Sequence, residues 1–205
     1  MVGIPATGPS TGQWFTALDG HRWWFDSGSP ALDFAYTGAM GTDLPWYSDA
    51  WEDLHEPADL GRWLGDRFAG IDATTSERDL VDATALRGAI ARIATAASRG
   101  DAPAAADIDV IKLFAATPDI PPSLAGGTRQ AGRSRARVGQ ALSQLAREAV
   151  ALFHPDALGR IRECSADDCQ LVYLDDSRSN NRRWCSMQRC GNRAKVRAHR
   201  AKFGG

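Results

Sequence analysis

The sequence has no long apolar run, and none approaches the roughly 18 residues that a membrane-spanning helix needs. Its first residues, MVGIPATGPSTGQ, lack the basic start and the apolar stretch of a signal peptide. We therefore expect a cytoplasmic protein with no membrane partner. In that reducing compartment, cysteines bind metal ions more often than they form disulfides.

The chain also lacks the short motifs that mark common catalytic sites. It has no glycine-rich phosphate loop, no Gly-x-Ser-x-Gly and no His-Glu-x-x-His. Asp26, Asp33 and His55 can be assembled into an acid–base set, but nothing in their spacing requires one. We therefore expect no catalytic residues and no enzyme activity.

Cysteine is absent before residue 164 and then occurs four times, at Cys164, Cys169, Cys185 and Cys190. The pattern is two Cys-x4-Cys pairs separated by 15 residues. Two close pairs of thiolates supply two edges of a tetrahedron, which is the geometry that zinc requires. Because all four ligands are protein thiolates, the predicted cofactor is one structural Zn²⁺ with no open position. The alternative is a group of buried or redox-active cysteines without metal.

Acidic residues are absent from Ser177 to the C-terminus, although nine basic residues occur there. The net charge of −1 divides unevenly along the chain. Residues 1–158 hold 13 Lys and Arg against 20 Asp and Glu, a net of −7, and residues 159–205 hold 11 against 5, a net of +6. Such segregation is typical of a modular chain whose basic module binds a polyanion.

We divide the chain into a flexible N-terminus at 1–20, a first domain at 21–158 and a zinc module at 159–205. Gly, Pro, Ser and Thr dominate the first segment, which favours loose structure. His21 to Met40 predicts two short strands around a turn, since Leu32, Phe34 and Tyr36 alternate in the second half. The segments 41–56 and 117–137 are predicted to be irregular.

Apolar residues at helical spacing predict four helices in the first domain, at about 57–69, 77–98, 104–116 and 138–153. Ser76 and Asp79 resemble a capping box, and Gly100 marks a helix end. In the zinc module, residues 171–174 favour a strand, and a helix is expected from near Met187. The expected fold class is α+β and mainly helical. A domain with a short β-hairpin and about four helices precedes a zinc-stapled, treble-clef-like hairpin and helix.

The last predicted helix places Arg189, Arg193, Arg197 and Arg200 within an arc of about 80°, at about 100° per residue. A row of arginines without acids among them suits phosphates. Asn192 could read adenine through its amide if the helix entered a major groove. The alternative is a solvated basic face. The predicted nucleic-acid-binding residues are Arg178, Arg182, Arg183, Arg189, Asn192, Arg193, Lys195, Arg197 and Arg200.

The residues around the cysteines resemble the CGNR zinc finger family. The segments that carry the resemblance are CSADDC from Cys164, YLD from Tyr173, RRWCSM from Arg182 and CGNRAK from Cys190. The similarity extends over about residues 160–202. It implies that the four cysteines of this chain are the zinc ligands of that family.

A second resemblance concerns Gly28 to Thr37, which is similar to the opening of the ABATE domain, a Gly followed by Leu-Asp-Phe-x-Asn-Thr. Tyr36 stands where that family usually has Asn, so the role of the Asn in ligand binding or turn formation does not carry over directly. Proteins that join ABATE to a CGNR finger are described as candidate stress-induced transcription regulators, mostly bacterial. The resemblance implies a sensing or dimerisation domain joined to a DNA-binding zinc module.

Six of the seven tryptophans lie before residue 64, which suggests an aromatic pocket in the first domain. A small-molecule effector could bind at Asp33, Trp46, Trp51 and Trp63. The alternative is that these aromatic residues fill the core or a dimer interface.

We therefore predict a transcription regulator that binds duplex DNA and responds to a small-molecule effector. Because one small module has a small footprint, we expect a homodimer that reads two half-sites. An RNA-binding module and a zinc-stabilised protein-interaction module remain as alternatives. Single-stranded RNA needs exposed aromatic residues, and near the zinc module the sequence offers Tyr173, Trp184 and Phe203.

Overall fold

The computed structural model describes residues 11–17, 20–40, 52–122 and 135–203. Within these ranges, seven α-helices and two small antiparallel hairpins make up the fold, which confirms the mainly helical α+β class. No helix in these ranges is both long enough and apolar enough to cross a membrane.

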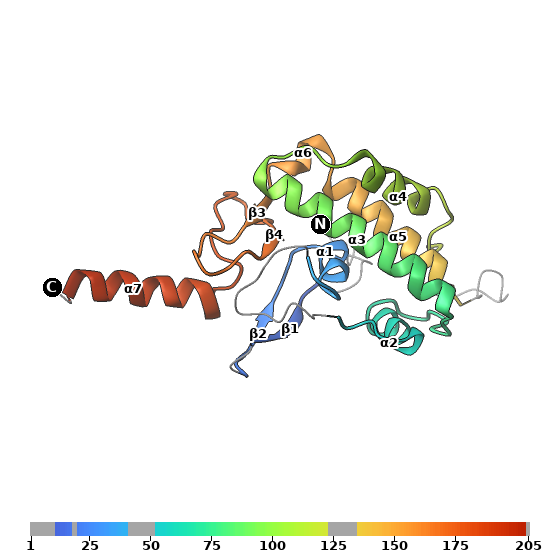
Figure 1. The fold of residues 1–205 in the computed structure, drawn as a ribbon, viewed down its shortest axis with the longest axis horizontal. Helices are drawn as coiled ribbons and strands as arrows, with labels where there is room; N and C mark the ends of the chain where they lie inside the picture. The colour runs from blue at the N-terminus through green and yellow to red at the C-terminus, as the bar shows by residue number, and fades with distance from the viewer. Residues whose placement is uncertain (1–10, 18–19, 41–51, 123–134, 204–205) are drawn as a thin grey trace, which may run out of the picture.

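Three helices form the body of the first domain: α3 (Glu77–Arg99), α4 (Ala105–Ala115) and α5 (Val138–Leu152). Helix α4 packs against both α3 and α5 (Figure 1). A fourth helix, α2 (Pro57–Arg67), packs beside them. All four predicted helices are confirmed, each with ends within two residues of the expected ones. The capping box of Ser76 and Asp79 is also confirmed.

A two-stranded sheet precedes the helices, formed by β1 (Gln13–Thr16) and β2 (Arg22–Phe25). The strands are antiparallel, and Trp14 lies opposite Trp24. The expectation that residues 1–20 are loose is therefore wrong for Gln13–Thr16. Phe15, Trp23 and Phe25 point into the core and supply the apolar face that fixes this strand, although its surroundings are rich in turn-forming residues.

The second predicted strand, over Leu32 to Tyr36, is instead the helix α1 (Pro30–Ala35). Ser29 caps this helix, because its Oγ accepts a hydrogen bond of 3.2 Å from the backbone N–H of Ala31. Pro30 occupies the first helical turn, where proline is favoured. All six residues of α1 are buried, so the alternation of large apolar residues reflects a fully buried helix and not a strand.

The C-terminal region begins with the short helix α6 (Pro155–Leu158) and a hairpin of β3 (Ile161–Glu163) and β4 (Val172–Leu174). A π-helical turn, η1 (Met187–Gly191), then leads into α7 (Asn192–Phe203). The predicted strand and the predicted helix start near Met187 are both confirmed. Helix α7 projects away from the rest of the molecule in Figure 1.

One hydrophobic core runs through both halves of the chain. The four cysteines and the residues of β4 belong to the same buried cluster as Phe25 and Tyr36 of the first domain. Helix α3 packs against β3, and Arg99 forms an ion pair of 3.5 Å with Glu163. The C-terminal region is therefore attached to the helical body by packing as well as by the chain.

Candidate zinc centre and nucleic-acid interface

The four cysteine side chains converge on one point. Their Sγ atoms all lie within 4.8 Å of one another, and all four residues are buried. The Sγ of Cys185 lies 3.7 Å from that of Cys169 and 3.5 Å from that of Cys190. Four thiolates at about 2.3 Å from a tetrahedral zinc ion are separated by about 3.8 Å, so the arrangement fits the metal. The cysteines are free of disulfides, and they bind one structural Zn²⁺.

Local backbone structure brings each pair of cysteines together. Cys164 directly follows β3, and its N–H donates to the carbonyl of Leu171, which closes the β3–β4 hairpin. The N–H of Cys169 donates to the carbonyl of Ala166 in a tight turn. Cys190 lies in η1, which presents it beside Cys185. A hairpin and a helical turn thus each supply one close pair of thiolates.

Hydrogen-bond donors surround the sulfur atoms. The N–H of Cys185 donates to the Sγ of Cys164 at 3.3 Å, and the guanidinium of Arg193 donates to the Sγ of Cys190 at 3.3 Å. Such donors stabilise the thiolate form that metal binding requires.

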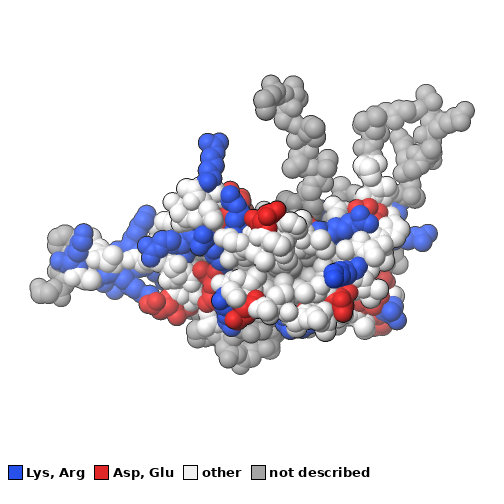
Figure 2. Space-filling model, turned by 90° about the horizontal axis from the view of Figure 1, so that it is seen from above, with Lys and Arg blue, Asp and Glu red and all other residues white. Residues whose placement is uncertain are grey.

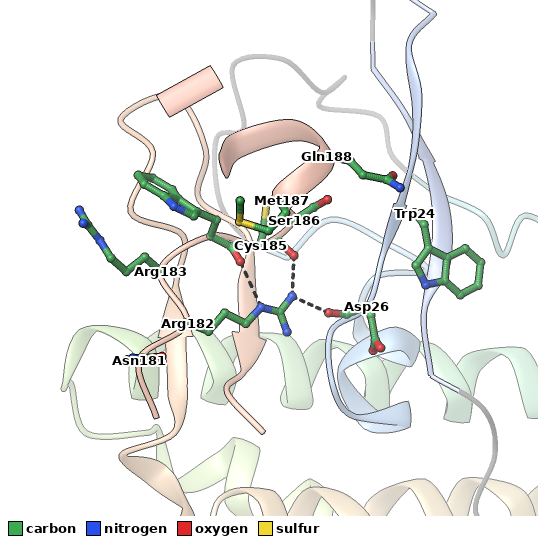
Figure 3. Close-up of a pocket in the computed structure, with 10 residues that line it drawn as sticks. Trp24, Asp26, Asn181, Arg182, Arg183, Cys185, Ser186, Met187 and Gln188 are labelled. Carbon is green, nitrogen blue, oxygen red and sulfur yellow. Dashed lines mark hydrogen bonds between the residues drawn. The ribbon is translucent and has the colours of Figure 1, made fainter. Parts of the chain in front are cut away.

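The loop that follows β4, from Asp175 to Arg182, is closed by a buried carboxylate. Asp175, whose side chain is fully buried, accepts hydrogen bonds from the N–H groups of Ser177 and Arg182 at 3.0 and 2.8 Å. Arg182 then donates to three carbonyl oxygens, those of Asp26, Trp184 and Cys185 (Figure 3). Its guanidinium also covers the ring of Tyr173 at 4.2 Å. Arg182 therefore holds the zinc module together and joins it to the first domain.

The four arginines of the predicted row have different surroundings. Arg189 is buried, and its guanidinium lies 3.8 Å from the ring centre of Trp23 in β2. Arg193 and Arg197 both form ion pairs with Asp168, at 2.8 and 3.2 Å. The row thus has an acidic partner, contrary to the expectation that no acid accompanies it. Asp168 was not recognised because it lies in the turn between the first two cysteines, far from the helix in sequence.

The remaining predicted nucleic-acid residues are exposed. The exposed members of the set are Arg178, Arg183, Asn192, Lys195, Arg197 and Arg200. Ala198 and Ala201, on another face of the helix, are exposed as well. Helix α7 consequently presents most of its surface to solvent.

The predicted effector residues do not form a described pocket. Trp46 and Trp51 lie outside the described residues. Trp63 packs against Phe34 with ring centres 5.1 Å apart, and Arg67 covers its ring at 4.3 Å.

Asp33, the other predicted effector contact, is fully buried and holds the hairpin in place. Its carboxylate accepts hydrogen bonds of 2.6 Å from the N–H of Gly12 and from the hydroxyl of Ser27. Burial raises the pKa of this carboxyl to about 6, against the lowering effect of those two hydrogen bonds. Both oxygens are therefore already used within the fold.

A junction between the two regions was not predicted from the sequence. The hydroxyl of Tyr36 donates to the carbonyl of Val172 at 2.9 Å and accepts from the N–H of the same residue at 2.7 Å. The N–H of Leu174 donates to the carbonyl of Ser27 at 2.8 Å. Gly28 has a φ of +79°, and a Cβ there would lie 2.8 Å from the carbonyl oxygen of Leu174. The loop before α1 therefore pairs with the outer edge of β4.

These features define a structural zinc finger packed onto a small helical domain. The sequence pattern of the CGNR zinc finger matches residues 160–202. The pattern of the ABATE family, described as "Putative stress-induced transcription regulator", matches residues 28–156. The chain belongs to the ABATE family and carries a CGNR zinc finger at its C-terminal end. A comparison with curated proteins gave no match.

Proposed function

We propose that the protein is a transcription regulator that binds duplex DNA through α7 and the basic residues at its base. The observation that carries this proposal is the projecting helix itself. Its exposed residues include Lys195, Arg197 and Arg200, and no carboxylate lies within its sequence. Blue side chains accordingly line the projecting end of the molecule in Figure 2. At 1.5 Å per residue, α7 is about 18 Å long, which suits a major groove.

The zinc centre gives this helix a rigid base. Cys190 lies in the turn that runs directly into α7, and Arg193 in the first turn of α7 bonds both to Cys190 and to Asp168. A segment of this size has too small a core to hold its shape alone, and metal binding supplies folding energy. In this proposal Arg182 and Arg189 position the helix, while the exposed Arg178, Arg183, Asn192, Lys195, Arg197 and Arg200 contact DNA.

The proposal assigns regulation to the first domain. The family description supports a regulatory and non-catalytic role. We propose that the protein acts as a homodimer in the cytoplasm and that a small molecule controls it. The acidic first domain would then bind the effector or the second copy of the chain, and the basic finger would bind DNA.

The test is the salt dependence of DNA binding by the full-length, zinc-loaded protein. The Arg197→Ala/Arg200→Ala variant should lower the slope of log K against log salt by about two, because each phosphate contact contributes about one. The control variant, Arg62→Ala/Arg78→Ala, removes two exposed arginines from α2 and α3. It should leave the slope unchanged. Equal slopes for both variants would remove α7 from the interface.

A second function is favoured by the ion pairs of Asp168 with Arg193 and Arg197. They show that this arginine face can meet a carboxylate, as it would on an acidic protein surface. A zinc-stabilised protein-interaction module would show concentration-dependent association without any DNA binding at low salt. The same titrations therefore decide between the two functions.

A further inference from the structure

The outer face of the β1–β2 hairpin carries two exposed tryptophans. Trp14 is 57% exposed and Trp24 is 41% exposed, whereas Phe15, Trp23 and Phe25 on the inward face are buried. The two rings form a cross-strand pair with centres 5.6 Å apart and planes at 76°. The guanidinium of Arg22 lies over the ring of Trp14 at 5.2 Å. Large aromatic surface left in solvent beside a cation is the arrangement of a stacking platform.

The geometry of this pair is fixed by the backbone beneath it. Gly12 has a φ of +95°, in the left-handed region, and a Cβ at this position would overlap the Trp24 ring. The N–H of Gly12 donates to the buried carboxylate of Asp33. The Trp24 ring thus lies on a glycine that the core holds in place, so its plane is set before any ligand arrives.

The hairpin faces the zinc finger across two adjoining grooves. The first has a volume of about 560 Å³ and lies between Trp24 and the segment from Asn181 to Gln188. Trp24 and Arg183 lie on opposite sides of it in Figure 3. The one carboxylate in the described lining of this groove, that of Asp26, accepts a hydrogen bond from the N–H of Gly28. The guanidinium of Arg183 covers Trp184 at 5.1 Å, which adds a second aromatic wall.

The second groove has a volume of about 430 Å³ and continues along α7. Gln188 lines both grooves, so they adjoin at that residue. The described lining of the second groove includes His21 at the hairpin and four arginines of the finger, and it contains no carboxylate. The arginines are Arg189, Arg193, Arg197 and Arg200. Aromatic walls at one end and a basic track at the other are the two parts that single-strand binding requires.

We infer that this cleft binds a single-stranded segment of nucleic acid, whose phosphates follow the arginines of α7 and whose bases stack on Trp24 at the edge of the first groove and on Trp14, which lies beside Trp24 outside that groove. The inference rests on the proposed function for its phosphate contacts and adds the hairpin of the first domain to the interface. Stacking suits unpaired bases because every base offers a π-face, while the bases of an intact duplex are already stacked. The first domain would thus take part directly in nucleic-acid binding.

The experiment measures binding of the full-length, zinc-loaded protein to a labelled dT oligonucleotide of about 15 nucleotides. The Trp14→Leu/Trp24→Leu variant keeps apolar side chains without a π-face and should bind about 10- to 100-fold more weakly. The Trp14→Phe/Trp24→Phe variant keeps the rings and should recover most of the affinity. The salt slope should stay the same in both variants, because no phosphate contact is removed. Zinc content and circular dichroism verify that each variant is folded.

Binding of dT by the leucine variant at native affinity would overturn the inference. It would also fail if heparin, a polyanion without bases, changed the part of the tryptophan fluorescence that the leucine variant lacks as strongly as dT does. A parallel uridine oligonucleotide identifies whether RNA or DNA is preferred, and either preference supports the cleft. Duplex binding without single-strand binding would leave the proposed function standing and remove this inference. Single-strand binding without duplex binding would remove the proposed duplex binding and leave this inference standing.

Discussion

Among single residues, Tyr36 makes the most specific contact between the two halves of the chain. Its hydroxyl is both donor and acceptor for the backbone of Val172. The Tyr36→Phe variant leaves a buried N–H and a buried C=O without partners, at a cost of about 3 kcal/mol in the free energy of unfolding. Urea unfolding of the zinc-loaded protein measures this cost. Hydrogen exchange should quicken at the amide of Val172.

The matched control for this prediction is Tyr173→Phe. The Tyr173 hydroxyl donates to the carbonyl of Arg182 at 2.7 Å, within the zinc finger itself. Its loss should destabilise the protein by about 1 kcal/mol and leave the Val172 amide protected. If both variants lose the same stability and the amide of Val172 stays protected in each, Tyr36 does not join the two regions as described.

Glu148 of α5 is a second residue whose environment has a measurable consequence. Burial raises its pKa to about 7, with the Asp33 carboxylate adding to the rise and a hydrogen bond of 3.0 Å from Ser29 opposing it. The folded state therefore favours the protonated carboxyl. The stability that this preference contributes is complete below about pH 4.5 and is lost as the pH rises through 7.

The Glu148→Gln variant keeps an acceptor for Ser29 but cannot ionise. Below pH 5 the variant and the native protein should differ little in free energy of unfolding. Above pH 7.5 the variant should be more stable by up to about 3 kcal/mol. Denaturant unfolding across this range gives the difference, in which the pH dependence of zinc binding cancels. The exposed Glu77→Gln variant serves as the control and should change stability little at any pH. A constant difference for Glu148→Gln would contradict the expected ionisation.

At the scale of elements, periodicity predicts those helices that have one buried face. Helices α3 and α5 bury apolar residues along one stripe, so the sequence shows their spacing and their caps. Helix α1 has no polar face because all six of its residues are buried, and its pattern cannot be told from that of a strand. The sequence feature that distinguishes a buried helix from a strand here is the helix cap, because Ser29 precedes Pro30 at the start of α1.

The C-terminal helix shows a different limit of sequence reasoning. Spacing along the chain predicts the zinc ligands, because each pair of cysteines is close in sequence and the four converge as expected. Spacing also places four arginines on one side of the helix. It cannot predict that Arg189 covers Trp23 or that Asp168 pairs with Arg193, since these partners come from distant segments. The exposed Trp24 was not predicted as a site residue for the same reason, because the segment across the groove from it belongs to the finger.

For the whole molecule, the continuous core argues against two independent folding units. The zinc ligands, Tyr173 and Phe25 belong to one buried cluster. Two hydrogen bonds cross the boundary: the carbonyl of Ser27 accepts one from the N–H of Leu174, and the hydroxyl of Tyr36 donates one to the carbonyl of Val172. A finger without its metal would lose the shape of the β4 edge, which Ser27 and Tyr36 contact. Unfolding of the finger should therefore expose α1 and the first hairpin as well as its own residues.

Metal removal tests this coupling directly. Because zinc binds the folded state, each tenfold increase in buffered free zinc above the dissociation constant should add about 1.4 kcal/mol to the stability of the chain. We expect a single thermal transition, followed through the tryptophans of the first domain, that moves upward with free zinc. The Cys185→Ser variant should unfold at a lower temperature that free zinc no longer changes. A separate transition of the helical domain, unmoved by zinc or by a chelator, would show that the finger is stabilised by its metal alone and that the shared core does not couple the two halves.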